Sequence, residues 1–302
     1  MEATGPVPSL RARLGGLLQL ARPLNVVMFF AGVALGGLLA SGLEAFAGQN
    51  TTRISLAMVS AALIGAAANA INDLFDLEID RVNRPGRPLP SGLVPLRAAR
   101  ALWATASALG VGLSAFLSWA HLGIAAASVG LLWGYSRWLK RTPLVGNLAI
   151  ALVLGLAIFY GGLAVAPFGE TFGWRAALLG AAFAFGSTLA REIAKDIEDA
   201  AGDEAGGART LPLVIGGEAS TWVAAVAVGG TLALFPLALT VGLGADFFLL
   251  ALPAAGLLLA AAWYLLSAPP ARRTRHAGAA SSLLKLAMVA GILALAGARL
   301  IG

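Results

Sequence analysis

The chain has 302 residues, a formal net charge of +6 at pH 7 and a mean hydropathy of +0.83, and only 12% of its residues are charged. A soluble domain carries about 25% charged residues, so this composition excludes an ordinary soluble protein and indicates a helical protein that crosses a membrane several times. The absence of cysteine excludes disulfides, thiolate metal ligands and a cysteine nucleophile.

Apolar segments long enough to cross a bilayer recur along the whole chain. We predict nine of them: Asn25–Ala40, Ile54–Leu77, Ala98–Ala120, His121–Leu139, Leu144–Val165, Trp174–Ala194, Ala219–Thr240, Phe247–Ser267 and Ala279–Leu300. The sequence therefore predicts an all-α integral membrane protein with nine transmembrane helices, forming one domain over residues 1–302. Residues 1–22 form a cytoplasmic N-terminal segment, either a short helix on the membrane surface or a basic tail that sets the topology.

The basic residues follow one orientation. In the nine-span topology, all of the 21 Lys and Arg residues except Arg53, Arg175 and Arg299 fall on the same side. Cytoplasmic loops are enriched in Lys and Arg, so we expect a multi-pass cell-membrane protein whose N-terminus and basic loops are cytoplasmic. Because topology accounts for this distribution, the pI of about 10.5 does not indicate a nucleic-acid partner.

Two aspartate clusters hold most of the acidic residues, since ten of the 15 lie in residues 73–80 and 192–204. The clusters share the spacing D-x-x-D-x-x-x-D and lie 123 residues apart: Asp73, Asp76 and Asp80, then Asp196, Asp199 and Asp203. The first cluster lies at the end of the second predicted span and the second cluster at the end of the sixth, and each is followed by a loop rich in Gly, Pro and Arg. This repetition predicts an internal duplication that brings both clusters to the cytoplasmic face.

The three aspartates of the first cluster fall within about 60° of one another on an α-helix. Asn72 widens this polar arc. In the second cluster Lys195 stands at the position of Asn72, and Gly202 is expected to disturb the helix before Asp203. So many carboxylates in an apolar protein require a cation, and oxygen ligands without histidine or cysteine suit Mg²⁺ or Mn²⁺. The alternative is that these charges solvate helix ends and balance arginines, which a duplicated register disfavours. We predict a Mg²⁺ site, with Mn²⁺ possible, whose ligands come from Asn72, Asp73, Asp76, Asp80, Asp196, Asp199 and Asp203.

Basic side chains near the two clusters are candidates for binding a diphosphate. Arg81, Arg84 and Arg87 follow the first cluster in a loop restrained by proline, and Lys140 and Lys195 lie at the same predicted membrane face. Cationic groups bind a diphosphate and stabilise it as a leaving group. The alternative is that these residues only set the membrane topology.

The segment Asn72–Gly92, NDLFDLEIDRVNRPGRPLPSG, resembles the first signature of the UbiA superfamily of intramembrane prenyltransferases. Asp199 and Asp203 match its second signature, D-x-x-x-D. The resemblance implies a UbiA-type bundle around a chamber, with a metal-bound prenyl diphosphate near the cytoplasmic face. It makes Asp76, Asp80, Asp199 and Asp203 the expected catalytic residues.

The resemblance extends beyond the aspartates to Arg22–Asn25, to Tyr135–Ser136 with Leu139–Lys140, and to Gly146–Asn147. Asn25 and Tyr135 lie in these matching segments, and Asn69 lies with Asn72 on the polar arc of the first cluster. We expect these three residues to bind substrate.

The segment Arg191–Pro212, REIAKDIEDAAGDEAGGARTLP, resembles the digeranylgeranylglyceryl phosphate synthases of the superfamily. The resemblance implies transfer of a geranylgeranyl group from its diphosphate to the glycerol hydroxyl of geranylgeranylglyceryl phosphate, forming an ether-lipid precursor. The expected partners are thus a prenyl diphosphate, a lipid-like acceptor and membrane lipids. An aromatic (4-hydroxybenzoate or quinone-type) or tetrapyrrole prenyltransferase is the alternative enzyme. A divalent-cation transporter, the remaining alternative, would hold its carboxylates near the bilayer centre.

Overall fold

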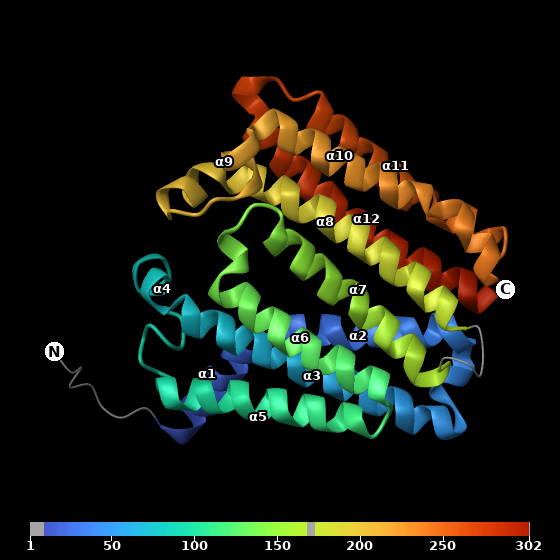
Figure 1. The fold of residues 1–302 in the computed structure, drawn as a ribbon, viewed down its shortest axis with the longest axis horizontal. Helices are drawn as coiled ribbons and strands as arrows, with labels where there is room; N and C mark the ends of the chain where they lie inside the picture. Colours follow the sequence, from blue (N-terminus) through green and yellow to red (C-terminus); the bar gives the residue numbers. More distant parts are fainter. Residues whose placement is uncertain (1–8, 168–172, 302) are drawn as a thin grey trace. The chain divides into compact units, whose positions relative to one another are not determined.

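The computed structural model describes residues 9–167 and 173–301, and this part of the chain is helical, without a strand (Figure 1). The α-helices are α1 Leu10–Ala21, α2 Pro23–Ser41, α3 Gly48–Phe75, α4 Leu77–Asn83, α5 Leu96–Ala115, α6 Trp119–Arg137, α7 Val145–Val165, α8 Trp174–Ala205, α9 Leu211–Ile215, α10 Gly217–Ala233, α11 Asp246–Leu266 and α12 Arg273–Ile301. Short 3₁₀ helices are η1 Gly42–Phe46, η2 Leu139–Arg141, η3 Phe235–Val241 and η4 Pro270–Arg272. The all-α prediction is confirmed.

Each predicted apolar segment coincides with a long helix, but the helices differ in how apolar they are. Among the described residues, seven segments have the length and hydropathy to cross a membrane: Pro23–Phe46, Gly48–Phe75, Val145–Val165, Trp174–Ala205, Gly217–Val241, Asp246–Leu266 and Pro270–Ile301. Helices α5 and α6 are long enough to cross a membrane, but their lower hydropathy leaves them outside this set.

The chain forms two compact units by its contacts. Unit 1 comprises Met1–Phe30 and Val59–Arg137, and unit 2 comprises Ala31–Met58 and Trp138–Gly302. The division falls within α2 and α3, so it does not follow the boundary of the predicted sequence duplication.

In unit 1, α1 and the loop after α4 pack on α3 and α5. Leu20, Leu89 and Val94 form a small core with Ala70 and Ala99. Gly16 permits this packing, since a Cβ there would lie 2.7 Å from a methyl group of Val94. Helices α5 and α6 pack side by side. The core therefore fixes α1 and the α4–α5 loop against the last turns of α3.

In unit 2, α8 lies against α7, α10 and α12, and α11 packs on α10 and α12 (Figure 1). Residues of α2 that belong to this unit cross α7 at glycines. A Cβ at Gly36 would lie 1.7 Å from the carbonyl oxygen of Ile158, and one at Gly161 would lie 1.9 Å from that of Val33. Backbone therefore packs directly on backbone at this crossing, as small residues allow between membrane helices.

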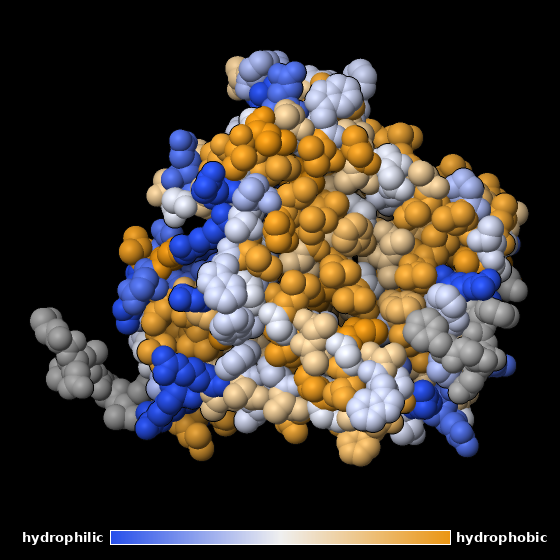
Figure 2. Space-filling model, viewed as in Figure 1, coloured by the Kyte–Doolittle hydropathy of each residue, from blue (hydrophilic) through white to orange (hydrophobic). Residues whose placement is uncertain are grey.

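The surface of the C-terminal helices is largely apolar. Figure 2 shows hydrophobic side chains spread over α10 and α11, with hydrophilic side chains gathered at the end of these helices near α9. Exposed large hydrophobic residues there include Trp222, Val226, Leu249, Leu259 and Trp263. A surface of this kind indicates contact with lipid, as expected for a multi-pass membrane protein.

Candidate functional site

The first aspartate cluster lies where α3 passes into α4. Helix α3 ends at Phe75, and Asp76 has φ −89° and ψ 1° before α4 begins at Leu77. The amide of Asp76 still donates to the carbonyl of Asn72 (3.0 Å), and that of Asp80 donates to the carbonyl of Asp76 (2.8 Å). The three aspartates therefore follow a nearly continuous helix, as predicted, with a break at Asp76.

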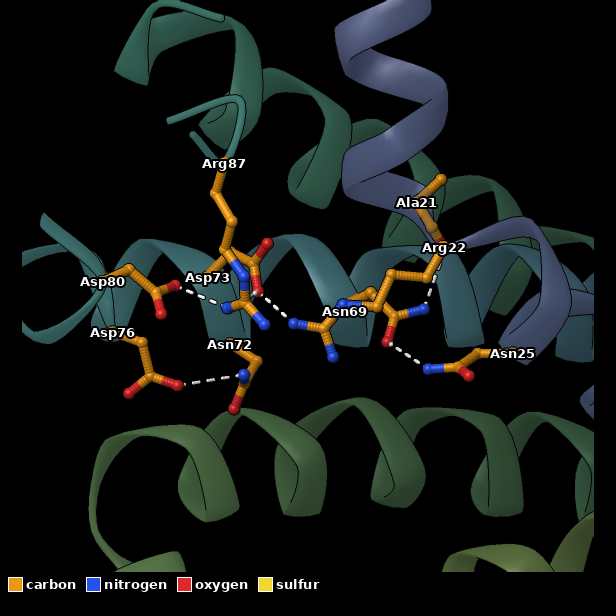
Figure 3. A network of polar contacts seen from close by, with 9 residues as sticks. All are labelled: Ala21, Arg22, Asn25, Asn69, Asn72, Asp73, Asp76, Asp80 and Arg87. Carbon is orange, nitrogen blue, oxygen red and sulfur yellow. Dashed lines mark hydrogen bonds and ion pairs between the residues drawn. The ribbon is translucent and has the colours of Figure 1, made fainter. Parts of the chain in front are cut away.

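A network of arginines and buried carboxylates surrounds this break (Figure 3). Asp73 and Asp80 are only 5% and 6% exposed. Arg22 donates from Nη2 to Oδ1 of Asp73. Arg87 Nη1 lies 2.6 Å from Oδ2 of Asp80 and 3.6 Å from Oδ1 of Asp73. Asp73 thus lies between two guanidinium groups, and Arg87 is shared between two carboxylates.

Asparagines continue the network on both sides of Asp73 (Figure 3). Asn72 donates from Nδ2 to Oδ2 of Asp76 at 3.0 Å. Asn69 accepts a hydrogen bond from Asn25 at 3.1 Å and donates to the carbonyl of Ala21 at 2.8 Å. Asn25 and Asn69, predicted to bind substrate, thus contact each other and join α3 to the α1–α2 junction, directly beside Arg22.

The three predicted loop arginines have different surroundings. Arg87 reaches the carboxylates, whereas Arg81 pairs with the exposed Glu78 at 2.8 Å. Arg84 is exposed at the end of α4, where its amide donates to the carbonyl of Asp80 at 2.8 Å. Within unit 1, the structure brings Arg87 directly into the polar network.

The second cluster lies on the last turns of α8, in unit 2. The helix continues through Gly202 to Ala205, so the expected disturbance before Asp203 is absent from α8. Asn147 of α7, 7% exposed, donates from Nδ2 to Oδ2 of Asp196 at 2.8 Å. Asp199 and Lys195 are exposed. Asp196 is therefore anchored to α7, while Asp199 and Lys195 face outward from the helix.

The loop after α8 also contacts the segment that carries Lys140. The amide of Arg209 donates to the carbonyl of Arg141 at 3.0 Å, which joins this loop to η2. Lys140 is half-buried in η2. Tyr135, half-buried on α6, belongs to unit 1.

An apolar cavity of about 80 Å³ lies within unit 2, between α8 and the C-terminal helices. Phe183, Ser187 and Gly180 of α8 line it, with Phe235 and Phe247 opposite. Gly180, Phe183 and Ser187 lie about 140–200° around the axis of α8 from Asp196. The cavity therefore lies on the side of α8 that faces away from the carboxylates.

The oxygen donors of both clusters fit a hard divalent cation in kind. Among the described residues, no three carboxylate or imidazole side chains form a ready-made metal site. In the first cluster, Arg22 and Arg87 pair with Asp73 and Asp80. Mg²⁺ needs only one or two protein carboxylates when phosphate oxygens and water complete its shell, so Asp76 beside the Asn72 amide meets that requirement.

Two residues of the site were not among the predicted ones. Arg22 and Asn147 each bind a predicted aspartate, Asp73 and Asp196 respectively. Both residues lie in short segments, Arg22–Asn25 and Gly146–Asn147, that resemble the superfamily. That resemblance marks both segments as part of the site. It does not show which aspartate each residue contacts.

Comparison with known proteins agrees with these features. The sequence profile of the UbiA prenyltransferase family matches residues 26–297. A relative from Methanopyrus kandleri, named digeranylgeranylglyceryl phosphate synthase, is 39% identical over 278 residues, covering 92% of this chain and 96% of the relative. A relative of the same name from Natronomonas pharaonis is 38% identical over 258 residues, covering 85% and 90%.

Solved structures show the same fold. One, described as giving structural and mechanistic insights into the biosynthesis of digeranylgeranylglyceryl phosphate synthase in membranes, has a TM-score of 0.84 at 30% identity, covering 96% of this chain and 99% of that one. A UbiA homolog from Archaeoglobus fulgidus, solved bound to GPP and Mg²⁺, has a TM-score of 0.66 at 20% identity, covering 92% and 99%. At that lower identity the likeness concerns the fold alone.

Proposed function

Because this chain belongs to the UbiA prenyltransferase family, we propose that it transfers a geranylgeranyl group from its diphosphate to the free glycerol hydroxyl of geranylgeranylglyceryl phosphate. The product is a digeranylgeranyl ether, a precursor of ether lipids. The observation that carries this proposal is the match to the Methanopyrus kandleri synthase, 39% identical over 92% of this chain and 96% of the relative. A match of that extent includes both aspartate clusters and the loops that follow them.

We propose that α5 and α6 complete a set of nine membrane-crossing helices. They have 20 and 19 residues, and about 20 residues suffice to cross the hydrocarbon core. The distribution of Lys and Arg supports a cytoplasmic N-terminus and cytoplasmic loops after both clusters. The repeated aspartate spacing supports a single catalytic domain over residues 1–302.

We assign metal binding to the carboxylate and amide oxygens of Asn72, Asp76, Asp80, Asp199 and Asp203. Asp73 and Asp196, which the sequence also predicts as ligands, are bonded to Arg22 and Asn147 and are left out of the proposed ligand set. When bound, Mg²⁺ (or Mn²⁺) supplies positive charge that stabilises the diphosphate as it leaves. The UbiA homolog solved with GPP and Mg²⁺ supports this choice of ligand class by analogy of fold. Arg81, Arg84, Arg87, Lys140 and Lys195 are the proposed cationic partners of the diphosphate oxygens.

In the proposed reaction, the bond between C1 of the geranylgeranyl group and the diphosphate oxygen breaks, and the electron pair leaves with the diphosphate. The cationic side chains stabilise that charge, and the apolar surroundings exclude water from the allylic cation. The glycerol hydroxyl oxygen then forms the new ether bond to C1. Its proton passes to a carboxylate of the clusters, for which Asp80 and Asp203 are the candidates.

Product identification tests this assignment. Purified protein is incubated with Mg²⁺, radiolabelled geranylgeranyl diphosphate and either geranylgeranylglyceryl phosphate or 4-hydroxybenzoate. The proposal predicts a labelled digeranylgeranyl ether phosphate with the first acceptor. Product from the aromatic acceptor alone would retain the family but move the function to quinone-type prenylation, which the named relatives do not favour. Metal flux into proteoliposomes without prenyl substrate would instead support a transporter.

A further inference from the structure

Three separate segments converge on the buried carboxylate of Asp73. Asp73 comes from the last turns of α3, Arg22 from the α1–α2 junction and Arg87 from the loop after α4 (Figure 3). Arg22 is 51 residues from Asp73 in sequence. The backbone of Arg22 lies in the left-handed region, with φ 52°, where a non-glycine residue is uncommon. The junction therefore adopts a costly conformation at the residue whose guanidinium group binds Asp73.

The surrounding packing holds both arginines in place. Leu20 of α1 and Leu89 of the α4–α5 loop share one small core with Ala70 of α3. Asn69 also donates to the carbonyl of Ala21, the residue before Arg22, at 2.8 Å. The two segments that supply the arginines are thus fixed to the same stretch of α3 that supplies Asp73.

The arrangement gives Asp73 a role different from that of its neighbours. Asp80 shares Arg87 with Asp73, so Arg87 keeps a carboxylate partner at 3.6 Å even when Asp80 binds another cation. A guanidinium group has five N–H donors, and the structure directs only some of those of Arg22 and Arg87 to carboxylates. Their side chains remain 33% and 24% exposed, which leaves both accessible to a ligand.

We propose that Asp73 is a positioning residue for these two arginines, and that Arg22 and Arg87 together bind one phosphate group of a substrate. The proposal rests on the proposed function, because the substrates of that reaction carry phosphate groups. Two planar guanidinium groups that approach the same carboxylate oxygen, Oδ1 of Asp73, are suited to bind the oxygens of a phosphate group. This phosphate belongs either to the prenyl diphosphate or to the phosphorylated acceptor, and the chemistry of recognition is the same for both.

The test compares Arg22→Gln, Arg22→Lys and Asp73→Asn with Arg11→Gln, a control that removes an exposed arginine of α1. Binding of inorganic pyrophosphate and of glycerol 1-phosphate is measured by calorimetry on the intact protein in detergent. Binding of Mn²⁺ is measured separately by electron paramagnetic resonance, with Asp76→Asn as the reference for the loss of a proposed metal ligand. KM for each substrate is then measured in the transfer assay.

Loss of a charge-assisted contact predicts that Arg22→Gln and Asp73→Asn weaken binding of one phosphate probe by about 10- to 100-fold. Arg22→Lys recovers part of the affinity, Arg11→Gln matches the wild type, and Mn²⁺ affinity changes less than about twofold in all four. The double variant Arg22→Gln with Asp73→Asn is no weaker than the worse single variant, because Asp73 acts through the arginines. Weakened pyrophosphate binding with a raised KM for the diphosphate identifies the donor. Weakened glycerol phosphate binding with a raised KM for the acceptor identifies the other source.

Two results would overturn the inference. One is wild-type affinity of Arg22→Gln for both phosphate probes, and the other is a loss of Mn²⁺ affinity in Asp73→Asn as large as in Asp76→Asn. Arg22→Lys and Arg11→Gln keep the test decisive if a more severe variant fails to fold. If wild-type protein prenylates only an aromatic acceptor while Arg22→Gln still loses pyrophosphate affinity, the proposed function fails and this inference stands.

Discussion

The crossing of α2 and α7 in unit 2 depends on glycine at Gly36. A Cβ at this position would lie 1.7 Å from the carbonyl oxygen of Ile158 and 3.0 Å from the backbone nitrogen of Gly162. A carbon atom approaches a carbonyl oxygen to about 3.3 Å, so Gly36→Ala must separate the two backbones by roughly 1.5 Å. Both atoms are backbone, and no side-chain rotation relieves the clash.

This separation predicts a large loss of stability for a single methyl group. Overpacking typically costs about 1–3 kcal/mol, and a clash between two backbones belongs at the upper end of that range. At roughly 2–4 °C per kcal/mol, we expect the Tm to fall by roughly 5–10 °C. The matched control is Gly230→Ala on α10, where an added Cβ meets no atom within 4 Å. Its expected change is a gain of up to about 1 kcal/mol, because alanine is the better helix former.

The assay is thermal unfolding of the detergent-solubilised protein, followed by the fluorescence of its seven tryptophans. Both variants are compared with the wild type in the same detergent. A Gly36→Ala protein as stable as Gly230→Ala would show that the helices do not cross at this distance.

Further predictions concern the polar clusters. Asp76→Asn should lower kcat by about 10²-fold or more, because it removes a proposed metal ligand. The control Glu218→Gln changes an exposed side chain of α10 and should leave kcat unchanged, and equal turnover of the two variants would refute the metal role. EDTA should abolish prenyl transfer, with recovery when excess Mg²⁺ is added; activity that persists in EDTA would contradict a divalent-metal requirement. Asn147→Leu should lower the free energy of unfolding by about 1–3 kcal/mol, because it leaves the part-buried Asp196 carboxylate without its 2.8 Å hydrogen bond. Asn147→Ser should lower it less, and a higher Tm for Asn147→Leu than for the wild type would refute this reasoning.

The helices and the register of the aspartates could be predicted from the sequence, because both follow from local patterns. Apolar length predicted the long helices, and the D-x-x-D-x-x-x-D spacing placed the first cluster on one helical arc. The break at Asp76 and the unbroken passage of α8 through Gly202 were not predictable in this way. Neighbouring contacts decide such backbone details, and they outweigh the weak helix propensity of one residue.

The pairings within the site depend on contacts between distant residues. Arg22 lies 51 positions before Asp73, and Asn147 lies 49 positions before Asp196. Nothing in residue type or spacing selects these partners from the many basic and amide side chains at the helix ends. The Arg22–Asp73 pair becomes visible only once Leu20 and Leu89 have fixed α1 and the α4–α5 loop on α3, and the Asn147–Asp196 pair only once α7 packs on α8. The proposed metal ligands and diphosphate-binding residues stay predictions to be tested.

In the proposed reaction, the free hydroxyl of a glyceryl phosphate attacks C1 of the geranylgeranyl group. The most direct measurement uses geranylgeranylglyceryl phosphate labelled with ¹⁸O in that hydroxyl, together with geranylgeranyl diphosphate, Mg²⁺ and the purified protein. Mass spectrometry then locates the label. We expect a digeranylgeranyl ether that retains ¹⁸O and a released diphosphate without it. Ether product lacking the label, or no product from this acceptor, would contradict it.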